Sequence, residues 1–186
     1  MNGKIEKDIN IWRIIPGEPE DRKSILCDFL VDDIIAVGYN EVGDLRVLGK
    51  SDEVEKEDLF KFVAERLKEA KDEEGEYSYG AIDKAKTVFR YFYKEMKIND
   101  IVIVYAEGYI FAIGIIVGDY EYEKVEKASE CNFTYSHRRK VKWILKKKIS
   151  TTELPNEIKR KLEHRHTIVK LDSADLPAIF VHIFTK

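Results

Sequence analysis

The residues of this sequence best suited to chemistry are the cations and aromatic rings between residues 131 and 149. This stretch carries seven basic residues and no acidic one. If residues 137–145 are extended, alternate side chains point to opposite faces, so Val141, Trp143 and Leu145 share an apolar face. The other face then carries Arg138, Lys140, Lys142 and Lys146. A strand with one apolar and one cationic face can lie along phosphates and release their counterions.

Two further residues of this region, Arg139 and Tyr135, are also candidate contacts, together with Tyr39. Arg139 falls on the apolar face by the same alternation, although we count it among the candidate contacts to a nucleic-acid backbone. Tyr135 stands just before the strand and Tyr39 just after another expected strand, and core packing explains neither position well. Aromatic rings in such loops are suited to stacking on bases. The alternative, that these rings and lysines form an ordinary solvated surface, stays open.

Motifs for catalysis are sparse. The sequence has no phosphate-binding GxxxxGK[ST], no GxSxG and no HExxH. His164 and His166 resemble a metal-chelating pair that His137 would complete, but no Cys or acidic residue follows at ligand spacing. Glu95-Met-Lys97 is the best match to the ExK of metal-dependent nucleases, and it falls at an expected helix end. We therefore expect no enzymatic activity, no metal and no cofactor.

Composition limits the class of protein. With 186 residues and 44% hydrophobic content, residues 1–186 fit a single domain. Charged residues make up 36%, mostly Lys and Glu, and Gln is absent, which indicates a heat-adapted organism. The two cysteines form no CxxC pair and no signal peptide is recognisable, so we expect a cytoplasmic protein. No apolar run reaches the ~20 residues of a membrane helix.

The expected elements are mixed in type and predict an α+β fold. Strands are predicted over 9–15, 34–38 and 167–171, a hairpin over 101–105 and 109–117, and the basic strand over 137–143. Helices are predicted over 19–30 and 153–162, and around Leu59–Leu67 and Ile82–Met96. Residues 39–45 form a loop, and residues 118–134 are expected to be irregular.

Several short motifs, taken together, resemble a known family. They are Ile11-Trp-Arg-Ile-Ile-Pro-Gly17, Ile35-Ala-Val-Gly-Tyr-Asn-Glu-Val-Gly-Asp-Leu45, Asn99-Asp-Ile-Val-Ile-Val104, Ile113-Gly114 with Gly118-Asp-Tyr120, and His137-Arg-Arg-Lys-Val-Lys-Trp143. The pattern is similar to the EVE domains of the PUA-like group, which are relatives of the YTH readers. Among these it resembles the amino-terminal DNA-binding domains of archaeal McrB proteins.

This resemblance implies a twisted PUA-like β-barrel flanked by helices, which binds a modified base turned out of its duplex. It places Tyr39 and Tyr135 as walls of an aromatic cage, where the relatives carry Trp, with Trp12 as a third wall. Asn40 would hydrogen-bond the base edge, because an amide matches the donor and acceptor pair of adenine.

The implied function is the recognition of methylated duplex DNA by the targeting domain of a methylation-dependent restriction system. N6-methyladenine is the first candidate base, and modified cytosine is the second. The implied partners are a GTP-hydrolysing motor region of the same full-length chain, of which this would be the N-terminal module, and a nuclease subunit. A reader of modified or structured RNA, a nucleic-acid-processing enzyme and a purely structural domain remain as alternatives.

Overall fold

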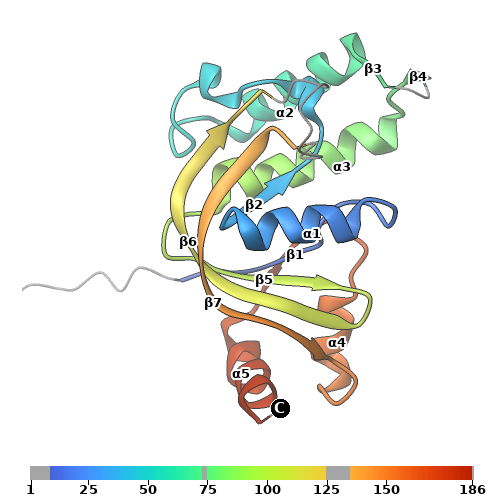
Figure 1. The fold of residues 1–186 in the computed structure, drawn as a ribbon. Helices are drawn as coiled ribbons and strands as arrows, with labels where there is room; N and C mark the ends of the chain where they lie inside the picture. The colour runs from blue at the N-terminus through green and yellow to red at the C-terminus, as the bar shows by residue number, and fades with distance from the viewer. Residues whose placement is uncertain (1–8, 73–74, 125–134, 186) are drawn as a thin grey trace, which may run out of the picture.

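The computed structural model describes residues 9–72, 75–124 and 135–185. Its main sheet has six strands, which are β1 (Ile11–Ile14), β2 (Ile34–Val37), β5 (Ile101–Ala106), β6 (Tyr109–Tyr122), β7 (His137–Ser150) and β8 (Ile168–Leu171). Their order is β2-β7-β6-β5-β1-β8, and a separate pair is formed by β3 (Lys71–Asp72) and β4 (Gly75–Glu76). The long strands β6 and β7 bend along their length, so the sheet curls into a half-barrel (Figure 1).

Helices cover both faces of the curled sheet (Figure 1). They are α1 (Arg22–Val31), α2 (Lys56–Glu69), α3 (Tyr79–Phe89), α4 (Asn156–Leu162) and α5 (Leu176–Phe184). Short 3-10 turns lie at η1 (Asn40–Val42), η2 (Leu45–Leu48) and η4 (Ser173–Asp175), and a π-helical segment, η3 (Arg90–Glu95), continues α3. The predicted α+β class, with a twisted sheet flanked by helices, is confirmed. Among the described residues, no helix has both the length and the apolar character needed to cross a bilayer.

Two separate hydrophobic cores lie on opposite faces of the sheet. Along β5, Val102 and Val104 belong to the core shared with α1, α2 and α3, whereas Ile103 and Tyr105 belong to the core shared with α4 and α5. A strand that is covered on both faces is apolar at nearly every position, which explains the continuous apolar run of β5. The same double coverage buries all four residues of β1.

Local turn chemistry fixes the central hairpin. Glu107 and Gly108 connect β5 to β6, and both have positive φ angles, of 52° and 81°. Two successive residues with positive φ are typical of the turn that matches the twist of antiparallel strands. The predicted hairpin is therefore confirmed, with Ile103 opposite Ile113.

The strands β6 and β7 are longer than the sequence predicted. β6 continues through Tyr122 and β7 through Ser150, with three register shifts between them. Residues 118–122 were expected to be irregular, but they belong to β6, and residues 120–122 pair with the start of β7, with Tyr122 opposite His137. Part of the expected irregular stretch, residues 125–134, lies outside the described residues.

Candidate nucleotide-binding site

The structure brings Tyr39 and Tyr135 into one corner of the molecule. β2 and β7 are antiparallel, with Val37 opposite His137, so the residues just beyond β2 meet those just before β7. The side-chain oxygen of Asn40 accepts a hydrogen bond from the backbone N–H of Ser136 at 2.9 Å. The ring of Tyr135 packs over Gly38, where an added Cβ would lie 3.4 Å from Cε1 of the ring. Asn40 therefore holds the two loop segments together.

A buried histidine supports the backbone of Tyr39. Tyr39 has φ 65° and ψ 48°, a left-handed conformation that is uncommon for a residue with a side chain. Its carbonyl oxygen lies 3.1 Å from Nε2 of His137, and Nδ1 of His137 lies 2.7 Å from the hydroxyl of Tyr120. Because a carbonyl only accepts, Nε2 carries the proton, and the Tyr120 hydroxyl donates to Nδ1. Burial lowers the pKa of His137 to about 4, so the ring is neutral at neutral pH.

The rings of both tyrosines are half-buried. The Tyr39 ring lies 6.4 Å from the ring of Tyr77 and 6.2 Å from that of Phe89, which fixes its position. Burial raises the pKa of Tyr39 and raises that of Tyr135 to about 12, and the charge of Glu18 acts in the same direction on both. Both phenols are therefore protonated at neutral pH and can donate hydrogen bonds.

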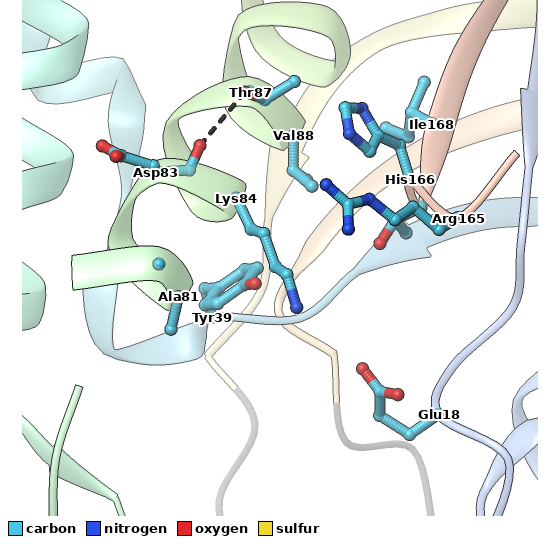
Figure 2. A pocket seen from close by; sticks show the side chains of 12 residues that line it. Glu18, Tyr39, Ala81, Asp83, Lys84, Thr87, Val88, Arg165, His166 and Ile168 are labelled. Atoms are coloured by element: carbon cyan, nitrogen blue, oxygen red, sulfur yellow. Dashed lines mark hydrogen bonds between the residues drawn. The ribbon is translucent and has the colours of Figure 1, made fainter. Parts of the chain in front are cut away.

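Tyr39 lines a cavity of about 670 Å³. The cavity lies between α3, the end of β2 and the segment that leads into β8, and Figure 2 shows its walls. Its lining residues are Glu18, Tyr39, Gly80, Ala81, Asp83, Lys84, Thr87, Val88, Arg165, His166, Thr167 and Ile168. This volume falls within the roughly 300–1,000 Å³ of small-molecule pockets. The combination of an aromatic ring, apolar side chains and polar groups suits a planar, polar ligand such as a nucleobase.

Two cations and a histidine at this cavity were missed by the reasoning from sequence. Lys84 comes from α3, and Arg165 and His166 come from the turn between α4 and β8. The sequence did offer a signal, because Lys84 lies off the apolar face of α3 that Ile82, Ala85 and Phe89 define. His166 was considered only as a metal ligand. The sequence did not indicate that β8 pairs with β1. This pairing places the turn before β8 at the cavity.

Two of the predicted contact residues are core residues, so these predictions are wrong. Trp12 is 0% exposed, and its indole N–H donates to Oδ2 of Asp100 at 2.7 Å. Arg139 is 1% exposed, and its guanidinium donates to the backbone oxygens of Phe92 and Tyr93 at 2.7 and 3.1 Å. Trp12 is enclosed because β1 is covered on both faces. Arg139 is enclosed because it falls on the inward face of β7, as the alternation of that strand indicated.

The outward cations of β7 are exposed or paired with acids. Lys140 lies 3.5 Å from Glu121, and Arg138 is paired with Glu123. Lys146 donates to Asp33 at 2.9 Å and to the carbonyl of Leu30 at the end of α1. The side chain of Lys142 is exposed. The predicted alternation of β7 is confirmed, because positions 139 and 141 are buried while positions 140 and 142 are exposed.

The described part of the chain holds no group of three or more His, Cys, Asp or Glu residues that could bind a metal ion. His137, the third member of the histidine set considered above, is occupied by its hydrogen bonds to Tyr120 and Tyr39. Glu95 of the possible ExK motif lies 3.2 Å from Nε of Arg90. His137 and Glu95 are therefore engaged within the fold.

Comparison with known proteins places the chain in a family. A family model described as Domain of unknown function (DUF8426) matches residues 12–172. The chain belongs to this family. No curated protein shows significant sequence similarity to it. Among solved structures, it is similar to the YTH domain of Zygosaccharomyces rouxii MRB1 protein in complex with N6-methyladenosine RNA, with a TM-score of 0.45 and 13% identity over 94% of this chain and 86% of that chain.

Proposed function

We propose that this domain binds nucleic acid, without catalysing a reaction on it, by taking one modified base against Tyr39 in the cavity. The single observation that carries the proposal is the cavity of about 670 Å³, which sets a half-buried aromatic ring beside apolar and cationic side chains. N6-methyladenine in duplex DNA is the first candidate ligand.

The energetics of base recognition agree with this geometry. Turning a base out of a duplex costs a few kcal/mol, and stacking on an aromatic ring returns roughly 1–3 kcal/mol. Ala81, Val88 and Ile168 give the cavity an apolar wall, on which an added methyl group would contribute roughly 0.8 kcal/mol. Methyl recognition alone therefore gives a preference, and tight binding also requires contacts with phosphates. Of the predicted backbone contacts, Lys140, Lys142 and Lys146 have exposed side chains on β7.

We further propose that the domain targets a methylation-dependent restriction system of the McrB type, in which a GTP-hydrolysing motor region of the same chain and a nuclease subunit act on the marked DNA. The motifs quoted above support this assignment. Recognition of modified RNA is the second candidate, because the same cavity and cations suit a single-stranded base equally well.

The test is to measure the binding of duplexes that differ by one N6-methyl group, with the matched RNA alongside. We expect Tyr39→Ala to lose roughly 5- to 150-fold in affinity for the methylated duplex, because it removes the stacking ring. Tyr39→Phe keeps the ring and should retain most of the methyl preference. Tyr135→Ala should lose less than Tyr39→Ala, because the Tyr135 ring packs over Gly38 and does not line the cavity.

Tyr109→Ala is the matched control, because Tyr109 is a half-buried tyrosine at the start of β6 that does not line the cavity. Equal affinity of the wild-type protein for all duplexes, unchanged in Tyr39→Ala, would refute the proposal. Stronger binding to the RNA would select the second candidate. Cleavage of any substrate by the purified protein with added Mg²⁺ would show that the domain is an enzyme.

A further inference from the structure

One side of the cavity carries two cations, Lys84 and Arg165, together with a histidine. Lys84, Arg165 and His166 all line it, and all three are exposed. Within residues 9–72, 75–124 and 135–185, neither Lys84 nor Arg165 lies within ion-pairing distance of a carboxylate. The cations Arg138, Lys140 and Lys146 of β7 each have such a partner.

In the described residues, the two carboxylates of the cavity form no ion pair with Lys84 or Arg165. Asp83 lies beside Lys84 in the sequence, but its carboxylate is 3.0 Å from Nζ of Lys86. Glu18 lies apart from Arg165 and His166 in Figure 2, across the cavity. Burial is the largest cause that lowers the pKa of His166. The neighbouring basic residues lower it further, and these are His164, Arg165, Arg13 and Lys84. The wall formed by α3 and the turn before β8 is therefore a region of positive potential.

A buried arginine holds this turn in place. The guanidinium of Arg13, on β1, donates to the backbone oxygens of His164 at 2.6 Å, His166 at 2.7 Å and Thr167 at 3.3 Å. Arg13 is 0% exposed, and burial lowers its pKa to about 10, so it remains charged at neutral pH. These hydrogen bonds fix the backbone on both sides of Arg165. Arg165 and His166 are thus presented by a turn with a defined conformation.

We infer that Lys84, Arg165 and His166 form the site for the backbone phosphate next to the captured base. The inference rests on the proposed function, since it assigns a second group of the same ligand to the same cavity. Planar guanidinium groups bind phosphate oxygens with paired hydrogen bonds, and an ammonium adds a point charge. In this arrangement the base stacks on Tyr39 while its phosphate meets the wall across from Glu18. Lys140 and Lys142 on β7 then contact phosphates farther along the nucleic-acid strand.

The inference is tested by replacing one phosphate of the methylated duplex with a neutral methylphosphonate, at the linkage next to the methylated base. The wild-type protein should lose roughly tenfold in affinity, the lower end of what a hydrogen bond to a charged group contributes, because Arg165 is exposed. Arg165→Ala should bind the charged and neutral linkages with nearly equal affinity. Lys84→Gln, which keeps a polar side chain on α3, should show a reduced difference.

Lys142→Ala separates the two cationic surfaces. It should weaken binding to both duplexes alike and keep the wild-type ratio between them, because Lys142 lies on β7 outside the cavity lining. The inference is overturned if Arg165→Ala keeps the wild-type ratio, or if the wild-type protein binds both linkages equally. Neither result would affect the methyl preference that tests the proposed function. If the wild-type protein showed no preference for the methylated duplex, the proposed function itself would be refuted.

Discussion

At the scale of single residues, the support of Tyr39 by His137 has a consequence for stability. His137 is buried and neutral in the fold, with a pKa of about 4 in place of its ordinary 6.5. The unfolded chain therefore binds a proton between these two values while the folded chain does not. Stability from this residue is fully present above pH 6.5 and is lost as the pH falls toward 4.

We expect the free energy of unfolding of the wild-type protein to fall more steeply between pH 6.5 and pH 4 than that of His137→Gln. The difference should reach about 3 kcal/mol, the equivalent of the shift in pKa. Glutamine can still donate to the carbonyl of Tyr39 but does not titrate. Urea denaturation at a series of pH values measures this. His164→Gln, at an exposed histidine, should follow the wild-type curve, and a parallel curve for His137→Gln would contradict the assignment.

At the scale of secondary-structure elements, the contact between β6 and β7 depends on a residue without a side chain. A Cβ added to Gly114 would lie 2.4 Å from Cγ1 of Val141 and 2.7 Å from Cε3 of Trp143. Real Cβ atoms do not approach other atoms so closely, so either the strands or the Trp143 ring must shift. The close approach places Trp143 where its indole N–H donates to the carbonyl of Phe29, in α1, at 3.0 Å.

Gly114→Ala should therefore lower the free energy of unfolding by roughly 1–3 kcal/mol, the usual cost of overpacking. Gly80→Ala is the matched control, because an added Cβ there would meet nothing nearer than Oγ of Ser78 at 3.9 Å. That substitution should raise stability by roughly 0.4–1 kcal/mol, because it restricts the unfolded chain. Equal effects of the two substitutions in urea denaturation would show that β6 and β7 can separate without cost.

The elements also show what could be read from the sequence. The β5–β6 hairpin and the two faces of β7 were predictable, because turn residues and alternation are local signals. The cavity was not, because its walls come from residues near 39, 84 and 165, and the segment near 165 reaches them through the long-range pairing of β8 with β1. The burial of Trp12 depends likewise on helices distant in sequence that cover β1. Tyr39 was identified from its loop position, whereas its neighbours in the cavity were missed.

At the scale of the whole molecule, one sheet separates two cores that share its strands. Trp12 and Trp143 report on the core with α1, α2 and α3, while Ile179 of α5 belongs to the other core. Because β1, β5 and β6 contribute side chains to both cores, neither core can form fully without the strands that complete the other. We expect the described parts of the chain to unfold in one cooperative transition.

Ile179→Ala removes a fully buried side chain and should lower the free energy of unfolding by roughly 2–5 kcal/mol. Tryptophan fluorescence, which monitors the opposite core, should shift to the same new midpoint as circular dichroism. Val181→Ala on the same helix, at a side chain that is 64% exposed, should change stability by less than about 0.5 kcal/mol. A fluorescence transition that stays at the wild-type midpoint would show that the two cores unfold independently.

The hydrogen bonds from Arg13 to the turn before β8 also bear on the kinetics of ligand capture. Fixing the backbone of one residue costs roughly 1–2 kcal/mol in conformational entropy. The backbone around Arg165 is already fixed in the folded protein, so binding does not have to order it. An arriving ligand encounters a preorganised surface, so no slow rearrangement of this turn should follow the encounter. For a single-stranded ligand, whose base need not be turned out of a duplex, the observed association rate should therefore rise linearly with ligand concentration, without reaching a plateau.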